Sequence, residues 1–235
     1  MPNKKSSYIE ITNGLGLELI QHSGSDNMVA DAARVSTDRD RQGRQIQGLI
    51  EYLARERHMS PFEHCHITFM IKAPLFVRDQ WVRHRTQSYN SLSLRYTKLP
   101  GGEEDSINLE DIFYYPPPNR PLENEGSASY PIFKQEPGLD EYSSVIKRLN
   151  KAYKTAYYSY LELLEVGVAS EVARSVLPEG TLTRFYATAN LRNWEAFVKE
   201  RTEVNAQWEI KQLAKAIDGC LSGLYPISWG ALRRE

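Results

Sequence analysis

The sequence lacks several features that would assign a protein to a class at once. Its 235 residues include only two cysteines, Cys65 and Cys220, which is too few for a disulfide framework and typical of a reducing compartment. No apolar run approaches the roughly 18 residues that a membrane span requires. The opening stretch MPNKKSSYIEITNG has a basic start but no apolar core like that of a signal peptide. We therefore expect a soluble, cytoplasmic protein that does not bind a membrane.

Strong net charge and the common nucleotide-binding motifs are missing as well. The formal net charge is −1, so bulk electrostatics would not draw the protein to nucleic acid. The chain has neither a GxGxxG fingerprint nor a P-loop, so nucleotide folds of those two kinds are not indicated. Any affinity for anions must come from local clusters of charge.

The hydrophobic pattern predicts helices in both halves of the chain. Apolar residues recur at helical spacing in several segments, and Asp26, Ser170 and Asn193 are candidate helix caps. We predict helices at about residues 26–35, 46–54, 74–84, 140–167, 170–177 and 193–224.

Strands are expected where the pattern alternates. Cys65, Ile67, Phe69 and Ile71 fall on one side of a half-buried strand, and residues 181–190 are extended or β-prone. The fold class is therefore α+β, with long helices packed on a small mixed or antiparallel sheet. The length fits one domain over residues 1–235, with an insertion rich in Pro, Gly and acidic residues at about 99–139.

One segment, RHRTQSYNSLSLRY at residues 83–96, is unusually rich in fixed positive charge and hydrogen-bonding groups. Residues 78–98 hold five cationic side chains and one acidic one, a local balance of +4. Gln80, Arg83, His84 and Gln87 would share one helical face. The segment could be a solvated basic face, a satisfied ionic network, a nucleic-acid-binding module in which tyrosines stack on bases, or a site for small anions.

The preceding motif HMSPFEH, at residues 58–64, suits an anion too. Ser60 and Glu63 have capping-box spacing with proline between them, and a helix N-terminus directs backbone N–H groups outward. The histidines of residues 58–66 lack the cysteine or carboxylate partners of a zinc site, so we expect no metal. We interpret both cysteines as small core residues.

A second polar cluster lies toward the end of the sequence. Arg174, Arg192 and Arg201 lie in VARSVLP, ANLRN and KERTEVNAQWEI, together with Asn190 and Asn205. Helical spacing would place Arg201, Asn205 and Trp208 on one side. Each arginine alone could pair with a nearby glutamate, but their convergence with the first cluster would be costly without anions between them.

These motifs together resemble the flavin-dependent thymidylate synthases. The sequence RHR followed by seven residues and Ser93 resembles the family signature, and AARVS, HMSPFEH, APLFVRDQWVRHR, EVARSVLP and AQWEI flank it in the same order. The resemblance covers roughly residues 26–98 and 165–218. It implies synthesis of dTMP from dUMP, with the carbon from methylenetetrahydrofolate and a hydride from FAD that NADPH reduces. It also implies a homotetramer with sites shared between chains, and no nucleic-acid partner.

The resemblance further implies roles for individual residues. Arg201 would be catalytic, because a fixed charge on the uracil favours the electron-rich form of the ring, and His58 would lie near flavin and folate. The FAD set is Ser36, Ser60, Glu63, Arg83, His84, Arg85, Asn190, Arg192 and Asn205. The dUMP set is Gln80, Arg83, Ser91, Ser93, Leu94, Arg95, Arg174 and Arg201.

Three positions depart from the family pattern. Ser91 stands where Glu or Gln is common, Leu94 replaces a frequent Gly or Gln, and Asn205 replaces a frequent His. Ser91 removes a long polar side chain from beside the nucleotide, and Asn205 can hydrogen-bond to flavin without carrying charge.

Overall fold

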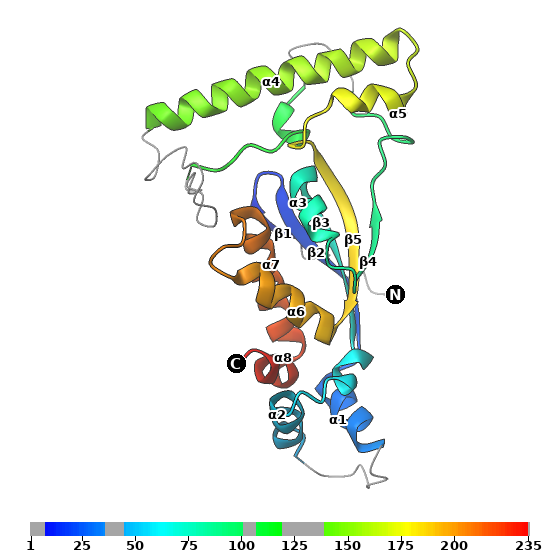
Figure 1. Cartoon of the computed structure of the whole chain (residues 1–235), viewed down its shortest axis with the longest axis vertical. Helices are drawn as coiled ribbons and strands as arrows, with labels where there is room; N and C mark the ends of the chain where they lie inside the picture. Colours follow the sequence, from blue (N-terminus) through cyan, green and yellow to red (C-terminus); the bar gives the residue numbers. More distant parts are fainter. Residues whose placement is uncertain (1–7, 36–44, 101–106, 119–138, 235) are drawn as a thin grey trace.

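The protein is built on one antiparallel sheet whose helices gather mainly on one side (Figure 1). A computed structural model describes residues 8–35, 45–100, 107–118 and 139–234. The strands are β1 (Tyr8–Thr12), β2 (Leu15–Ser23), β3 (His66–Pro74), β4 (Ser88–Ser91) and β5 (Leu182–Asn190), in the order β1-β2-β3-β5-β4. Every neighbouring pair is antiparallel, which confirms the α+β prediction.

The described helices overlap the predicted helical segments, except α8, which was not predicted. The α-helices are α1 (Asp26–Val35), α2 (Gln47–Arg55), α3 (Leu75–Trp81), α4 (Leu139–Glu165), α5 (Ser170–Ala173), α6 (Leu191–Thr202), α7 (Trp208–Leu224) and α8 (Pro226–Leu232). Short 3₁₀ turns are η1 (Ser60–His64), η2 (Leu109–Asp111) and η3 (Arg174–Val176).

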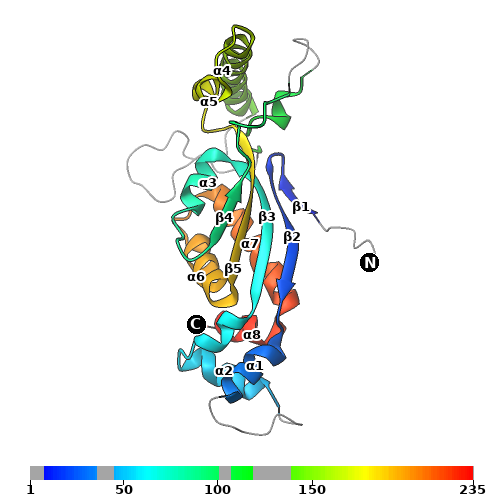
Figure 2. The ribbon, with the colours of Figure 1, turned by 90° about the vertical axis from the view of Figure 1, so that its right-hand side faces the viewer.

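The two central strands, β3 and β5, form the sheet's best-paired ladder. They are in register from His66 opposite Asn190 to Pro74 opposite Leu182. Alternate side chains such as Phe69 and Ala187 are fully buried, as the alternating pattern predicted. Figure 2 shows α3, α6 and α7 beside this ladder, so its buried face points toward the helices.

Aromatic side chains fill the space between this face and the helices. Trp81 of α3 lies 4.4 Å from the ring of Phe197 in α6, and both are fully buried. Phe69 meets Trp194 edge to face at 5.2 Å. Such pairs stabilise a core beyond the area they bury, and here they fix α3 and α6 relative to each other.

The opposite face of the sheet has little cover from the described part of this chain. Tyr186 is 46% exposed and Arg184 is also exposed on β5, while the neighbouring Met70 of β3 is half-buried. Thr68 and Thr188 share a hydroxyl hydrogen bond of 2.9 Å across the two strands. The described part of the chain therefore leaves this face largely uncovered.

A second, smaller hydrophobic cluster lies under α4. Phe113 stacks on Tyr153 at 4.6 Å, and Ile112 and Tyr157 are buried with them. Ile112 and Phe113 belong to the predicted insertion at about 99–139. Its described residues 107–118 are ordered by packing on α4 and by an isolated bridge between Phe113 and Thr181.

Three predicted helix caps were wrong, and the first of them is Asp26. Ser25, not Asp26, accepts the α1 cap hydrogen bond, from the N–H of Met28 at 3.4 Å. The Asp26 carboxylate instead accepts the N–H groups of Ile227 and Ser228 at 3.1 and 2.8 Å, at the start of α8. The tertiary fold therefore supplies Asp26 with two backbone donors that lie far from it in the sequence.

The two helix caps predicted in the second half of the sequence, Ser170 and Asn193, were also wrong. Ser170 makes no cap hydrogen bond, and Asn190 rather than Asn193 caps α6, accepting the Asn193 N–H at 2.9 Å. The predicted final helix is in fact two, because the chain leaves helical geometry at Glu203 (φ −56°, ψ 155°). Asn205 therefore lies in the connection between α6 and α7, so the predicted helical face with Arg201 does not form.

Candidate functional site

The centre of the candidate site is a contact between α6 and the turn after α3. Arg201 donates from Nε to His84 Nε2 at 2.9 Å, and His84 packs edge to face on Phe197 at 4.8 Å. Burial, and next the Arg201 charge, lower the pKa of His84, although Glu200 acts in the opposite direction. His84 is therefore a neutral imidazole whose Nε2 accepts, so its proton lies on Nδ1.

Gln80 joins this centre from the end of α3. Its backbone carbonyl accepts a long hydrogen bond from Arg201 Nη2 at 3.5 Å. Its side chain donates from Nε2 to Oε1 of Gln207, just before α7. Gln80, His84 and Arg201, three residues predicted to share a site, are thus in direct contact.

The hydroxyl group of Tyr89 stabilises the turn that carries His84. This hydroxyl lies 2.7 Å from the His84 carbonyl oxygen and 3.0 Å from that of Trp81. Gln87 is buried and accepts from Trp81 Nε1 at 3.1 Å, so its predicted place on the same face as His84 was wrong. Inward anchoring at these positions leaves Arg83 and Arg85 exposed at the surface.

Arg83 and Arg85 differ from Arg78 and Arg201 in their ion pairs. Among the described residues, no carboxylate pairs with Arg83 or Arg85. By contrast, Arg78 pairs with Asp79 at 3.0 Å and Arg201 with Glu200 at 3.2 Å. A planar guanidinium without a protein partner suits a phosphate group.

The flavin set predicted from the resemblance is spread around this turn. Arg192 pairs with Glu63 at 2.5 Å, so Glu63 does not form the predicted capping box, and Ser60 makes no cap hydrogen bond either. Asn193 donates from Nδ2 to the Thr86 carbonyl at 3.1 Å, which ties α6 to the turn. His58 lies 6.0 Å from the ring of Tyr52. Ser36 lies outside the described residues.

A second group of predicted residues lies where β4 ends. Ser91 accepts from Arg78 Nε at 3.2 Å, and Arg95 pairs with Glu171 at 3.2 Å, although both of these charged groups are half exposed. Leu94 and Arg174 line a cavity of about 400 Å³ below α5. Ser93 accepts the N–H of Arg95 at 3.3 Å at its edge.

The two groups do not meet in one chain through polar contacts. Within the described ranges, no hydrogen bond or ion pair joins Gln80, His84 or Arg201 to the group of residues 91–95 and Arg174. Each group therefore presents part of the predicted dUMP set separately.

Two residues of this region were not predicted as functional from sequence. Tyr89 and Gln207 stand inside quoted motifs, but their roles depend on partners that only the fold supplies. The spacing of Gln80 and Gln207, 127 residues apart, carries no signal of their contact.

The Cys65 thiol donates to the Ser25 carbonyl at 3.7 Å and not to any described residue of the predicted site. Burial raises the pKa of the Cys65 thiol to about 11, and burial also raises that of Cys220. A thiol with a raised pKa is a poor nucleophile at neutral pH. Across the described residues, no three His, Cys, Asp or Glu side chains are grouped as metal ligands.

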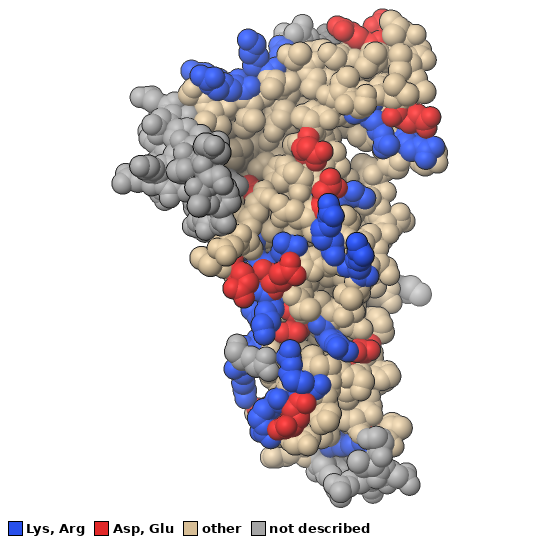
Figure 3. All heavy atoms as spheres, in the orientation of Figure 1, with Lys and Arg blue, Asp and Glu red and all other residues tan. Residues whose placement is uncertain are grey.

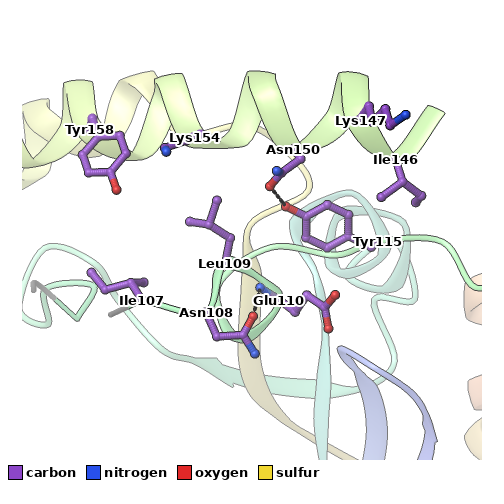
Figure 4. A pocket seen from close by; sticks show the side chains of 10 residues that line it. All are labelled: Ile107, Asn108, Leu109, Glu110, Tyr115, Ile146, Lys147, Asn150, Lys154 and Tyr158. Atoms are coloured by element: carbon purple, nitrogen blue, oxygen red, sulfur yellow. Dashed lines mark hydrogen bonds between the residues drawn. The ribbon is translucent and has the colours of Figure 1, made fainter. Parts of the chain in front are cut away.

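Another cavity, of about 410 Å³, lies between α4 and residues 107–115 (Figure 4). Lys147, Asn150 and Lys154 reach into it from α4, and the Tyr115 hydroxyl donates to Asn150 Oδ1 at 3.0 Å. None of the predicted site residues lines it, so it is separate from the arginine-rich centre.

Charge on the visible surface is mixed in sign. Figure 3 shows Lys and Arg interspersed with Asp and Glu on this face, without a continuous positive stripe. Such a surface does not favour a nucleic-acid-binding module. In the described part of the chain, none of the helices combines the length and apolar character that crossing a bilayer needs.

Comparison with known proteins identifies clear relatives. Residues 18–227 match the family described as thymidylate synthase complementing protein. A flavin-dependent thymidylate synthase of Thermotoga neapolitana is 42% identical over 202 residues, or 86% of this chain and 82% of the relative. One from Thermus thermophilus is 38% identical, over 93% of this chain and 76% of the relative.

Solved structures give the same result. The UMP/dUMP methylase PolB of Streptomyces cacaoi, bound with 5-Br UMP, aligns with a TM-score of 0.80 at 35% identity over 95% of both chains. Its complex with 5-Br dUMP aligns with a TM-score of 0.81 at 34% identity, over 95% of this chain and 96% of that one.

Proposed function

The chain belongs to the flavin-dependent thymidylate synthase family, and from that premise we propose that its arginine-rich site makes dTMP from dUMP. The enzyme is an FAD-dependent methyltransferase, and methylenetetrahydrofolate provides the one-carbon unit. The observation that carries this function is the family match across residues 18–227, which includes both arginine-rich segments. The nucleic-acid-binding alternative has no comparable support.

The flavin would bind at the turn after α3. Arg83 and Arg85 are exposed guanidinium groups without carboxylate partners among the described residues, and they suit the diphosphate of FAD. His84 between them would offer a neutral ring. When bound and reduced at the expense of NADPH, FAD supplies the hydride. We assign the remaining flavin contacts to Ser36, Ser60, Glu63, Asn190, Arg192 and Asn205, with His58 near flavin and folate.

The nucleotide would be held by residues from both groups. We assign the dUMP contacts to Gln80, Arg83, Ser91, Ser93, Leu94, Arg95, Arg174 and Arg201. Arg95 and Arg174 offer cations for the phosphate, while Gln80 offers an amide for the uracil edge. Arg201 would place a fixed positive charge against the ring and stabilise negative charge that develops on it.

The Arg201–His84 contact suits this role. Neutral His84 accepts a hydrogen bond from Arg201 Nε without reducing the charge of the guanidinium group. A carboxylate in the place of His84 would neutralise that charge. Glu200 is the one carboxylate paired with Arg201 among the described residues, and its side chain is 60% exposed. Solvent weakens such a pair, so much of the Arg201 charge remains for the substrate.

Assembly would complete the site. Among the described residues, no hydrogen bond or ion pair joins the two dUMP-binding groups, and Tyr186 on the less covered face of the sheet is 46% exposed. Both observations support a homotetramer in which one chain supplies Gln80 and Arg201 and another supplies residues 91–95 and Arg174. We also propose that residues 1–235 form one domain, with an insertion at about 99–139, and that the enzyme works in the cytoplasm.

The decisive experiment is an anaerobic assay of purified protein with FAD, NADPH, methylenetetrahydrofolate and dUMP. We expect dTMP and NADP+ in equal amounts during turnover. When the folate is omitted, we expect no dTMP and no NADP+ beyond the amount that reduces the bound flavin once. A parallel reaction with UMP tests the ribonucleotide, because one structural relative is described as a UMP/dUMP methylase. A flavin-loaded protein that turns over neither nucleotide would overturn the proposal.

A further inference from the structure

A chain of side-chain hydrogen bonds connects the proposed nucleotide site to the segment under α4. Gln80 Nε2 donates to Gln207 Oε1, and Gln207 Nε2 donates to Glu209 Oε2 at 2.9 Å. The Tyr114 hydroxyl donates to the other carboxylate oxygen, Glu209 Oε1, at 3.0 Å. Glu209 is 1% exposed and Tyr114 is 4% exposed, so these two residues at the end of the hydrogen-bond chain are shielded from water.

The chemistry of these groups gives the chain a direction. Both carboxyl oxygens of Glu209 accept hydrogen bonds, Oε1 from the Tyr114 hydroxyl and Oε2 from Gln207 Nε2, so Gln207 presents its NH₂ group to Glu209. Gln207 must then present its carbonyl oxygen to Gln80, and Gln80 must answer with its own NH₂ group. A buried acid on α7 therefore sets which way the amide of Gln80 faces.

The orientation of the Gln80 amide matters because its oxygen and its second N–H hydrogen could bind a ligand. Among the described residues, its Oε1 accepts no hydrogen bond and its amide group donates only to Gln207. The edge of a uracil ring offers one N–H donor between carbonyl acceptors, which matches an amide held in one orientation. A reversed amide would set donor against donor, and an unmatched polar pair is costly.

The far end of the chain is anchored firmly. The Tyr114 N–H donates to the Gly180 carbonyl at 2.8 Å, and its own carbonyl accepts from the Tyr153 hydroxyl of α4 at 3.0 Å. Tyr114 also packs edge to face on Phe76 of α3 at 5.8 Å. The phenol that meets Glu209 is thus fixed by Gly180, which precedes β5, and by α3 and α4.

We propose that Gln207 and Glu209 are positioning residues that hold the amide of Gln80 in the orientation that binds the pyrimidine of dUMP. Tyr114 fixes Glu209 from the segment of residues 107–118. This inference rests on the proposed function only in taking Gln80 as a nucleotide contact.

The test compares dUMP binding by flavin-loaded Glu209→Gln, Gln207→Leu and Tyr114→Phe proteins, titrated by calorimetry and followed by steady-state kinetics. Losing the acceptor-only group lets the chain reverse, so we expect Glu209→Gln to raise the Kd and KM for dUMP about five- to tenfold. Flavin content should stay near that of the wild type. Tyr114→Phe should give a smaller rise, because Gln207 still meets the carboxylate.

Tyr225→Phe is the matched control for Tyr114→Phe. Tyr225 is fully buried and donates to the Ser23 carbonyl at 2.8 Å, outside this chain of hydrogen bonds. We expect its loss to lower Tm without changing the Kd for dUMP. If Glu209→Gln fails to fold, Gln207→Leu tests the same link, because Gln207 is only half-buried.

A double-mutant cycle with Gln80→Ala separates the possible results. If Glu209 acts through Gln80, the double variant binds dUMP no more weakly than Gln80→Ala alone. Additive losses, or an unchanged Kd in both folded single variants Glu209→Gln and Gln207→Leu, would overturn the positioning role. If Gln80→Ala alone leaves the Kd unchanged, the assignment of Gln80 fails instead, and dTMP formation by the wild type still tests the enzyme's function separately.

Discussion

Arg201 donates from Nε to Nε2 of His84 at 2.9 Å, so this side of its guanidinium meets a neutral ring, while Nη2 pairs at 3.2 Å with the exposed Glu200 carboxylate. The arrangement keeps the charge in a fixed place without neutralising it. His84 in turn packs on Phe197, which belongs to the aromatic core between the sheet and α6. The position of the Arg201 charge is therefore determined by the core.

We predict that Arg201→Ala nearly abolishes dTMP formation while flavin remains bound. Losing a preorganised charge at a reacting centre costs roughly 10²- to 10³-fold in kcat. Turnover and flavin absorbance should be measured on the same preparation. Arg233→Ala is the control, since Arg233 pairs with Asp218 at 3.3 Å away from the site, and its turnover should match the wild type. Near-normal turnover by Arg201→Ala would reject the assigned role.

Mixing two inactive variants tests whether sites are shared between chains. Arg201→Ala damages one dUMP group and Arg174→Ala damages the other. Random co-assembly of the two variants should restore about a quarter of the sites, because some interfaces then combine the two intact groups. Activity of the co-expressed pair, compared with each variant alone, measures this. No recovery in a mixed oligomer would indicate that each chain builds its own site.

The lowered pKa of His84 predicts a dependence of stability on pH. Burial, and then the Arg201 charge, make protonation harder in the folded protein than in the unfolded chain. The contribution of neutral, buried His84 to the free energy of unfolding is complete above about pH 6.5, the ordinary pKa of histidine. It is lost as the pH falls below 6.5 toward the lowered pKa of His84 in the folded protein. Urea unfolding from pH 7.5 to 5.5 should show a steeper loss for the wild type than for His84→Gln. Parallel curves would contradict this.

Thiol chemistry should be dispensable. Burial raises the pKa of Cys65 to about 11, so little thiolate exists at neutral pH. We expect the Cys65→Ser, Cys220→Ser double variant to retain measurable dTMP formation, provided that it folds. Turnover should be compared at equal flavin content, with circular dichroism to confirm folding. A folded, flavin-loaded double variant without activity would mean that a thiol takes part.

Tyr89 should stabilise both the protein and its flavin site. Tyr89→Phe removes the hydroxyl between the His84 and Trp81 carbonyls, and we expect the free energy of unfolding to fall by about 1–2 kcal/mol. Flavin retention on gel filtration should also fall. Tyr142→Phe is matched, because its hydroxyl donates to the Pro116 carbonyl at 3.0 Å. It should lose stability without losing flavin, and equal flavin loss in both variants would contradict the specific role.

Sequence periodicity predicted the parts of the fold where one face is clearly buried. β3 alternates cleanly because it lies in the sheet's interior against helices. β2 was not predicted from its pattern, since only its first residues are buried and a register shift between Leu19 and Gln21 interrupts the alternation. Strands at or near an open edge carry weaker signals for this reason.

The break between α6 and α7 shows a different limit. The sequence there, EVNAQ, has neither glycine nor proline, so local propensity does not mark it. Gln207 leaves the helical path and contacts Gln80 and Glu209. Motif resemblance indicated which segments matter, but the partners of Tyr89 and Gln207 depend on contacts between distant parts of the chain.

The contact between Asp26 and α8 can form only late in the synthesis of the chain. Its carboxylate receives the first N–H groups of α8 from Ile227 and Ser228, the latter 202 residues further along the chain. A growing chain cannot make this contact until residue 228 has left the ribosome, so α1 and α8 must join after most of the protein has been made. Until then, the Asp26 carboxylate stays in water, and the two helices cannot complete their shared part of the core.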